Sequence, residues 1–324
     1  MKNKSLQPYL WILISGFAFS WMITFAALAS RGTNWQTVAL ARCVIPLATV
    51  ALWAWWDGAK LIVWNSPILW MRSLAGSCSL VGTFYALSFM PPTEIFTITN
   101  IFPIWVALLS WPVLGRFPSG LVWLSILSSI VGVAVIQGGE LRTGNYGVLI
   151  VVGVSLLSAI AMMGLNRLKH LDPRSVVVHF SATALVAALG SLFLFPMELP
   201  SEAFHWTHWA ELLGVGLSAS VGQYFLTRAF TTGEPARVSV ASLSQFVFVL
   251  IFDVTLVGNA LDWNKLWGIP LILGPTAWLM LQRVKTSSIA PSSVAGPPRD
   301  NEPSPAVAAE LAICADSAVG GKSE

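Results

Sequence analysis

Ten apolar runs, each about as long as a membrane is thick, occupy most of this chain. They cover residues 9–30, 36–56, 66–90, 93–114, 119–138, 145–165, 175–196, 205–230, 237–257 and 264–282. A helix needs roughly 20 apolar residues to cross about 30 Å of hydrocarbon. Transmembrane strands alternate in polarity, whereas residues 126–136 are apolar or small at every position. The pattern predicts an all-α, polytopic membrane protein with ten transmembrane helices.

The composition argues against several other classes of protein. Of the 324 residues, 55% are hydrophobic and 10% are charged, whereas soluble domains carry about 25% charged residues. The net charge of +3 is too small for a nucleic-acid partner. Cys43, Cys78 and Cys314 are too widely spaced for a disulfide framework or a local metal site. We therefore expect a lipid bilayer around the chain, no nucleic-acid partner, no metal and no cofactor.

The distribution of Lys and Arg predicts the orientation in the membrane. Ten of the eighteen Lys and Arg fall in segments on the side of the N-terminus, and three fall in loops on the opposite side. Cytoplasmic loops carry the excess of positive charge, so both termini are predicted to be cytoplasmic, in a plasma membrane or bacterial inner membrane. Residues 286–324, rich in Ser, Pro, Ala and Gly, are predicted to form a disordered cytoplasmic tail.

The ten runs divide into two sets of five that align with an offset of 143 residues. Pro92 then falls on Pro235, and segment 114–116 falls on segment 257–259. Because five is an odd number, the second set is inverted relative to the first, a construction common among secondary transporters. The alignment predicts one five-helix repeat over residues 1–143 and a second, inverted repeat over residues 144–285.

Several short motifs resemble those of one transporter family. They are Arg72-Ser73-Leu74-Ala75-Gly76, Phe84-Tyr85-Ala86-Leu87, Met90-Pro91-Pro92-Thr93-Glu94, Gly222-Gln223, Arg228-Ala229-Phe230, Phe252-Asp253 and Gly268-Ile269-Pro270-Leu271-Ile272. On these segments the chain resembles the drug/metabolite transporter superfamily, specifically proteins with two EamA-type repeats. The resemblance implies a ten-helix carrier for small metabolites. One departure is that Arg116 and Asn259 stand where the family's turn carries an acid, so a role of that acid does not transfer.

Polar and aromatic residues inside the apolar runs are the candidates for substrate binding, because polar side chains in lipid face the bundle interior. The candidates are Asn100, Gln223, Tyr224, Gln245, Trp21, Tyr85, Trp105, Arg42 and Asp253. Each has a structural alternative: an amide can form an interhelical hydrogen bond, an aromatic ring can simply pack, and Asp253 can pair with Arg42. Arg72 lies about as deep in its run as Arg42 but from the cytoplasmic side, and Arg228 lies within a turn of a helix end. Both are interpreted first as interfacial anchors or helix-capping cations, with substrate contact as the alternative.

These observations favour a secondary transporter that works by alternating access. The chain lacks a phosphate-binding loop of the Gly-x-x-x-x-Gly-Lys-Ser/Thr type, which leaves exchange, uniport or ion coupling as the driving force. The expected substrate is a small zwitterionic or neutral polar metabolite, and the expected assembly is a monomer or homodimer. The alternatives are an integral-membrane enzyme, for which His205 and His208 are a pair without a clear third ligand, and a receptor for a small ligand. No catalytic residue is assigned.

Overall fold

The computed structural model consists of helices throughout the part of the chain that it describes. It describes residues 6–58, 61, 66–86, 89–90, 95, 98–115, 117–137, 146–195, 206–257 and 266–281. The helices are α1 (Gln7–Ala29), α2 (Trp35–Trp56), α3 (Pro67–Ala86), α5 (Phe102–Leu114), α6 (Gly120–Gln137), α7 (Tyr146–Arg167), α8 (Pro173–Leu194), α9 (Trp206–Thr232), α10 (Pro235–Ser242), α11 (Gln245–Phe252), η1 (Asp253–Val257) and α13 (Gly268–Leu281). The predicted all-α class is confirmed. The predicted tail lies outside the described residues.

The helices follow the apolar runs closely, with two differences. Where the sequence predicts one helix over 93–114, α5 begins only at Phe102. Where it predicts one helix over 237–257, the chain forms α10, α11 and a π-helical turn. Five described helical segments are long and apolar enough to cross a membrane, and three shorter helices are apolar as well. Among the described residues, this criterion does not by itself confirm all ten of the predicted spans.

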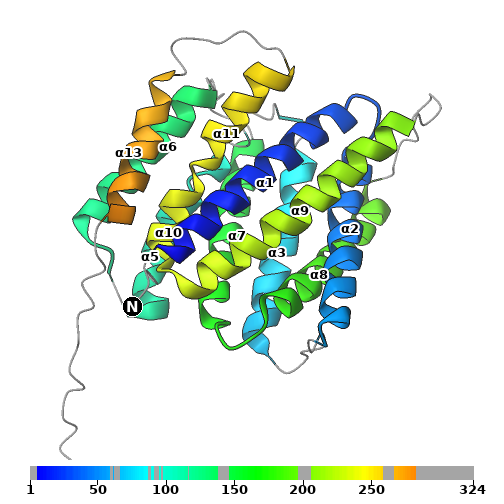
Figure 1. Ribbon diagram of the computed structural model, residues 1–324, viewed down its shortest axis with the longest axis horizontal. Coiled ribbons are helices and arrows are strands. Elements are labelled where there is room, and N and C mark those ends of the chain that lie inside the picture. The colour runs from blue at the N-terminus through cyan, green and yellow to red at the C-terminus, as the bar shows by residue number, and fades with distance from the viewer. Residues whose placement is uncertain are drawn as a thin grey trace, which may run out of the picture. The chain divides into compact units, whose positions relative to one another are not determined.

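The helices pack in a pattern that repeats when the two halves are exchanged. The exchange replaces α1, α2, α3, α5 and α6 by α7, α8, α9, α10–α11 and α13. It converts the α1–α9 pair into α7–α3, α2–α9 into α8–α3, and α1–α11 into α7–α5, and all six pairs are packed. The pairs α2–α8 and α6–α13, at opposite edges of the bundle in Figure 1, convert into themselves. The two halves are thus related by an approximate two-fold axis.

The α6–α13 pair lies on this axis. Ser128 Oγ donates a hydrogen bond of 3.1 Å to the carbonyl oxygen of Leu271, a residue 143 positions later. The helices approach closely at Gly132, where a Cβ atom would stand 2.8 Å from the carbonyl oxygen of Gly268 and 2.9 Å from Leu271 Cβ. Backbone at that distance leaves no room for a methyl group, so Gly132 determines how closely α6 and α13 approach.

We expect Gly132→Ala to lower the free energy of unfolding by about 1–3 kcal/mol, because an added methyl group overpacks this contact. Gly153 in α7 is the matched control, since a Cβ there meets nothing within 4 Å. Gly153→Ala should be neutral or raise stability by about 0.5–1 kcal/mol through helix propensity. Thermal melts of both variants in detergent measure the difference. Equal melting temperatures would show that the α6–α13 approach tolerates a side chain.

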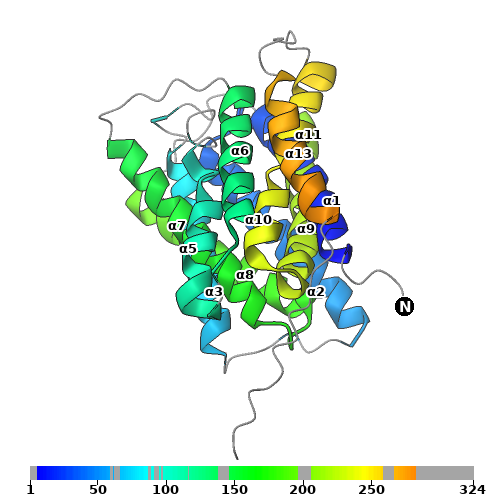
Figure 2. The ribbon, with the colours of Figure 1, turned by 90° about the vertical axis from the view of Figure 1, so that its left-hand side faces the viewer.

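Two helices are interrupted at equivalent places in the two halves. The amide of Ile101 bonds the carbonyl of Ile98 at 3.1 Å, and the amide of Ser244 bonds the carbonyl of Ala241 at 3.2 Å. Both bonds span three residues instead of the four of an α-helix, and they lie 143 residues apart. α10 and α11 are therefore separate segments, next to α6 and α13 (Figure 2).

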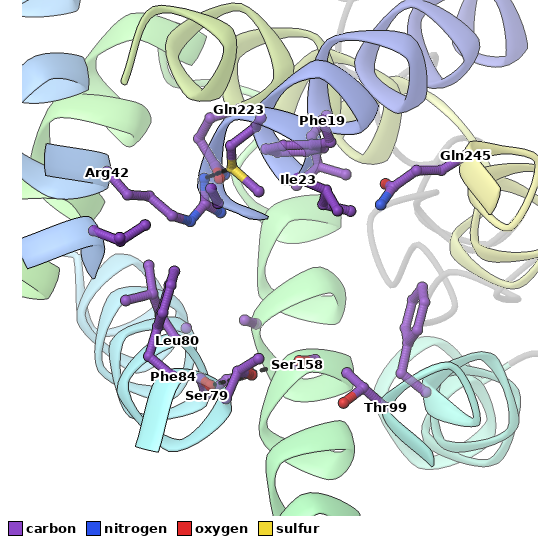
Figure 3. A pocket seen from close by; sticks show the side chains of 18 of the residues that line it. Phe19, Ile23, Arg42, Ser79, Leu80, Phe84, Thr99, Ser158, Gln223 and Gln245 are labelled. Atoms are coloured by element: carbon purple, nitrogen blue, oxygen red, sulfur yellow. Dashed lines mark hydrogen bonds between the residues drawn. The ribbon is translucent and has the colours of Figure 1, made fainter. Parts of the chain in front are cut away.

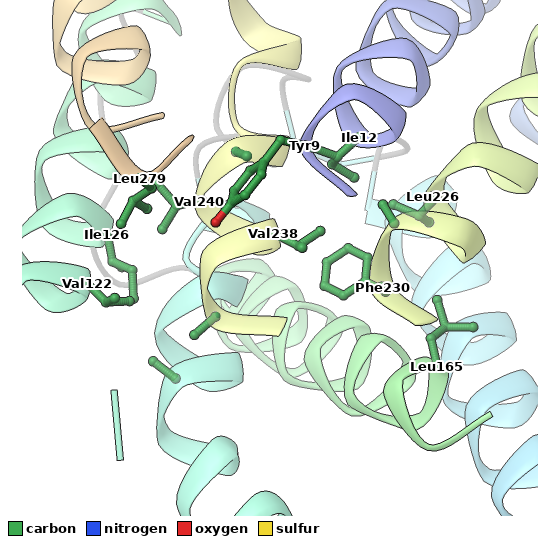
Figure 4. Packing of buried hydrophobic residues seen from close by; sticks show 14 of the residues in the cluster. Tyr9, Ile12, Val122, Ile126, Leu165, Leu226, Phe230, Val238, Val240 and Leu279 are labelled. Atoms are coloured by element: carbon green, nitrogen blue, oxygen red, sulfur yellow. The ribbon is translucent and has the colours of Figure 1, made fainter. Parts of the chain in front are cut away.

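The largest group of buried apolar residues lies at one end of the bundle, which we call the closed end. The closed end contains the first turns of α1, α3, α8 and α10 and the last turns of α7, α9 and α13. Its core, which we call the closed-end cluster (Figure 4), includes Tyr9, Ile12, Leu69, Leu165, Leu168, Val176, Leu226, Phe230, Val238 and Leu279. Apolar burial of this extent seals the bundle at this end.

Candidate functional site

A cavity of about 1090 Å³ extends from the opposite end, the open end, toward the closed-end cluster. The residues at its mouth belong to the α1–α2 connection and to the ends of α3 and α8; they are Ser30, Thr33, Asn34, Trp35, Tyr85 and Phe195. Ile12 and Phe230, which belong to the closed-end cluster, also line the cavity. The cavity therefore reaches one end of the bundle and stops at the other.

The cavity lining comes from both halves in equivalent positions. Six pairs of lining residues are separated by 143 positions: Ser15 and Ser158, Phe19 and Met162, Leu80 and Gln223, Thr83 and Leu226, Thr99 and Ser242, and Phe102 and Gln245. The approximate two-fold axis therefore passes through the cavity. The chemistry of the two halves differs, however, because the second half places amides where the first has Leu80 and Phe102.

Arg72 in α3 lines the cavity and is buried, with 1% of its surface exposed. Its Nε and Nη1 atoms have no hydrogen-bond partner among the described residues, and its guanidinium carbon lies 4.1 Å from the centre of the Phe180 ring. Gly164 makes room for it, since a Cβ there would stand 2.9 Å from Arg72 Cβ. The interpretation of Arg72 as an interfacial anchor is thus wrong. The position of Arg72 in the sequence indicates how deep it lies along α3, but not that its side chain points toward the interior of the bundle.

Arg42 in α2 also lines the cavity, as the sequence suggested. Its Nη1 atom lies 2.8 Å from the sulfur of Met22, and its guanidinium carbon lies 5.3 Å from the centre of the Phe19 ring. Figure 3 shows Arg42 and Gln223 directed toward the same part of the cavity. Two cations and an amide thus face the cavity from α2, α3 and α9.

Asn100 and Gln245 line the cavity at the two helix interruptions. Asn100 immediately precedes the Ile101 turn, and Gln245 is the first residue of α11. α1 supports the second interruption, because Ser20 Oγ donates to the carbonyl oxygen of Gln245 at 3.0 Å. A Cβ at Gly16 would stand 3.3 Å from Gln245 Cβ. Interrupted helices with polar groups beside the break are a feature of transporter binding sites.

Some lining residues were not anticipated from the sequence. Ser79 and Ser158 join α3 to α7 through a hydrogen bond of 2.6 Å (Figure 3). Ser15 Oγ donates to the carbonyl oxygen of Gly222 at 2.8 Å. These three hydroxyl groups lie at close helix–helix contacts, where small polar residues are common. The 143-residue offset is a signal that could have identified them, because it relates Ser15 to Ser158 and Ser79 to Gly222.

The remaining sequence candidates lie in several places. Tyr85 lines the mouth, and its ring centre lies 4.3 Å from that of Phe195. The other aromatic candidates are not among the lining residues: Trp21 packs on Phe25 and Phe252, Tyr224 packs on Trp53, and Trp105 Nε1 donates to Ser155 Oγ at 2.9 Å. Asp253 begins η1, and its side chain is outside the described part. His205 lies outside it too, and the described residues contain no cluster of three metal-ligating side chains.

A contact between α7 and α9 distinguishes the closed end from the open end. Asn166 Nδ2 donates to the carbonyl oxygens of Phe230 and Gly233, at 3.0 and 2.9 Å. The equivalent residue in the first half is Ile23, which lines the cavity. Consistently, α7 packs against α9, whereas the equivalent helices α1 and α3 are not among the closely packed pairs of described helices. The two halves are thus arranged differently at the two ends.

An ion pair adds to the contacts at the closed end. Arg174 at the start of α8 pairs with Asp57, which follows α2, and with Asp172, the N-cap of α8. Hydrogen bonds from Arg174 hold the pKa of the Asp172 carboxyl group below its usual value. Exposed pairs of this kind contribute little to stability, so the closed-end cluster is the main seal.

Comparison with known proteins identifies relatives along most of the chain. The family model described as the EamA-like transporter family matches twice, over residues 6–137 and 145–281. A pseudopaline exporter of Pseudomonas aeruginosa (strain UCBPP-PA14) is 27% identical over 245 residues, covering 73% of this chain and 82% of the exporter. A probable transport protein of Saccharomyces cerevisiae is 25% identical over 263 residues, covering 72% of each chain.

A solved crystal structure has the same fold. It superposes with a TM-score of 0.69 at 20% sequence identity, covering 82% of this chain and 96% of the other. At this level of identity the similarity concerns the fold alone.

Proposed function

Because the chain belongs to the EamA-like transporter family, we propose that it is a secondary carrier that moves a small metabolite by alternating access. Membership makes the chain an integral membrane transporter. The proposal adds the mechanism: the two repeats rearrange about the cavity, so that it opens alternately toward each side of the membrane.

One observation carries this proposal. A cavity lined by equivalent residues of both repeats reaches only one end of the bundle, and the closed-end cluster fills the other. If the two repeats exchanged their arrangements, the same bundle would open at the opposite end. Repeats related by a two-fold axis in the membrane plane alternate in this way around a central site.

The sequence supports a proposal for the driving force and for the orientation in the membrane. Without a phosphate-binding loop the chain has no P-loop site for ATP, so we propose exchange, uniport or ion coupling. The excess of Lys and Arg on the side of the N-terminus supports cytoplasmic termini. The closed end, where α1 begins, then faces the cytoplasm, and the cavity opens outward. We place the carrier in a plasma membrane, which in a bacterium is the inner membrane.

A thermal-shift screen of the purified full chain tests whether the cavity binds metabolites. Ligands that bind only the folded state raise stability, by about 2.7 kcal/mol at a concentration of 100 times Kd. Pools of amino acids, carboxylic acids, nucleosides, vitamins and nucleotide sugars are the probes, and each hit is tested for counterflow in proteoliposomes. We expect at least one pool to raise Tm and its active member to show counterflow. No shift in any pool, together with no counterflow, would contradict the carrier proposal.

Substitution of Gln245 locates the binding site. Gln245→Ala removes an amide that lines the cavity and should weaken binding of the screen's hit about tenfold, equivalent to about 1.4 kcal/mol. Gln7→Ala, at an exposed position at the start of α1, is the control and should leave binding unchanged. Equal affinities for both variants would place the hit outside this cavity.

A further inference from the structure

We propose that the cavity binds an organic anion, that Arg72 holds its carboxylate group, and that Arg42 supplies a second positive charge on the way in from the open end. The inference rests on the proposed carrier function and narrows its substrate class. It departs from the zwitterionic or neutral metabolite expected from the sequence, because the sequence did not place Arg72 in the cavity.

Arg72 is a buried cation for which the described residues provide too few hydrogen-bond acceptors. Two of its three guanidinium nitrogens are buried without a hydrogen-bond partner among the described residues. Burying a charged group is costly unless it is paired. Phe180 offers one face of its ring, which stabilises a cation but accepts no conventional hydrogen bond. A carboxylate in the cavity supplies the missing acceptors, because a guanidinium group can bind both oxygens of a carboxylate at once.

The charge of the cavity lining also favours an anionic substrate. Among the described residues that line the cavity, Arg42 and Arg72 are charged, and none is Asp or Glu. In the described part of the chain, Arg42 has one side-chain hydrogen-bond acceptor, the Met22 sulfur, which is a weak acceptor. The lining therefore carries two positive charges and attracts an anion, while repelling a cation of similar shape.

The rest of the lining indicates that the anion has an apolar body. Phenylalanines from both halves line the cavity: Phe19, Phe84, Phe102, Phe180, Phe195, Phe230 and Phe246. Their rings favour burial of apolar or aromatic groups. A volume of about 1090 Å³ slightly exceeds the usual range of about 300–1,000 Å³ for small-molecule sites. A monocarboxylate with an aromatic ring is thus a suitable minimal probe.

The two arginines approach the cavity from opposite ends. Arg42 lies seven residues into α2, which begins at the open end, and Arg72 lies five residues into α3, which begins at the closed end. At 1.5 Å per residue they are about 10 Å and about 8 Å from those ends. An anion entering from the open end meets Arg42 first and Arg72 farther in, nearer the closed end. After a switch of the repeats, Arg72 becomes the cation nearer the new opening.

The test compares three probes with the same benzyl group and different charge: phenylacetate, phenylacetamide and phenethylamine. Each is added at equal millimolar concentration and constant ionic strength to the purified full chain, and Tm is measured. We expect phenylacetate to raise Tm and the amide and amine to leave it nearly unchanged. An equal or larger shift with either of the other two, or no shift with phenylacetate, would overturn the inference.

Variants assign the effect to the arginines. Arg72→Gln and Arg42→Gln should each weaken phenylacetate binding at least tenfold, whereas Arg72→Lys, which keeps the charge, should retain the preference for the anion. Arg228→Gln is the matched control, because Arg228 lies outside the cavity with its guanidinium carbon 4.4 Å from the centre of the Trp11 ring. If Arg72→Gln does not fold, Arg42→Gln and Arg72→Lys still provide the test. Undiminished phenylacetate binding in both glutamine variants would overturn the assignment.

The tests of the anion site and of the carrier function can fail independently of each other. A neutral or cationic metabolite that shows counterflow while phenylacetate does not bind would refute the anion inference and leave the carrier intact. Phenylacetate binding that requires the arginines, without counterflow of any solute, would support the anion site and contradict the carrier.

Discussion

Replacing Ile23 with tryptophan is expected to block the cavity. Ile23 lies in α1, lines the cavity and points into it in Figure 3. A large indole ring at this point stands nearer the mouth than Ser158 does, because Ile23 is six residues from the open end of α1 and Ser158 is twelve residues from the open end of α7. A thiol introduced by Ser158→Cys, in a background without native cysteines, should react with a membrane-impermeant thiol reagent. Adding Ile23→Trp should slow that reaction by roughly tenfold or more, because a wedge that excludes water also excludes the reagent.

The control for this prediction is Ile14→Trp in the same helix. Ile14 has 42% of its surface exposed and is not among the lining residues, so its replacement should leave both the reaction rate and Tm unchanged. Ile23→Trp should also leave Tm nearly unchanged, because the ring occupies existing empty space. Equal reaction rates in the two tryptophan variants would show that access to Ser158 does not pass Ile23.

Replacing Asn166 with leucine is expected to shift the protein toward a form that is open at the other end. The substitution removes two hydrogen bonds, one to the carbonyl oxygen of Phe230 in α9 and one to that of Gly233, which follows α9, and leaving a buried acceptor unpaired costs about 1–3 kcal/mol. The first repeat has Ile23 in the equivalent place, so the open end loses nothing. Because 1.4 kcal/mol changes an equilibrium tenfold, the population of the alternate form should rise by at least that factor.

A cysteine in place of Val177 measures this change in population through its reactivity with a thiol reagent. Val177 is fully buried in α8 and lies 143 residues after Asn34, which lines the mouth of the cavity. Val177→Cys should be almost unreactive in the parent and react at least tenfold faster when Asn166→Leu is added. Thr231→Val is the control, since the Thr231 hydroxyl group bonds carbonyls of its own helix. If Val177→Cys remains unreactive toward the thiol reagent when Asn166→Leu is added, and the Tm is normal, then the α7–α9 contact does not keep the closed end closed.

The sequence predicted the helices and their inverted arrangement because hydropathy and the 143-residue offset are properties of the chain alone. It did not predict the interruption at Leu243, which has no Gly or Pro beside it, whereas Pro103, in the first turn of α5, stands just after the interruption at Asn100. The break at Leu243 therefore depends on packing, in particular on the close approach of Gly16 and Ser20 to Gln245.

The candidate site was predicted in part, for a physical reason. Residue count gives the depth of a side chain in the membrane but not the direction in which it points. Asn100, Gln223 and Gln245 face the cavity, whereas Trp105, at a similar depth, donates a hydrogen bond to Ser155 in the neighbouring helix. Arg72 was assigned to the interface by depth, and only the packing of α3 on α7 and α8 shows that it points inward.

Alternating access is tested most directly by measuring thiol reactivity at Asn34→Cys and Val177→Cys, each with and without Asn166→Leu, in cysteine-free membrane vesicles of known orientation. Alternating access predicts opposite changes: Asn166→Leu lowers reactivity at Asn34→Cys from one side of the membrane and raises it at Val177→Cys from the other. Reactivity that rises at both positions, or changes at both from the same side, would contradict alternating access and indicate local loosening or a continuous channel.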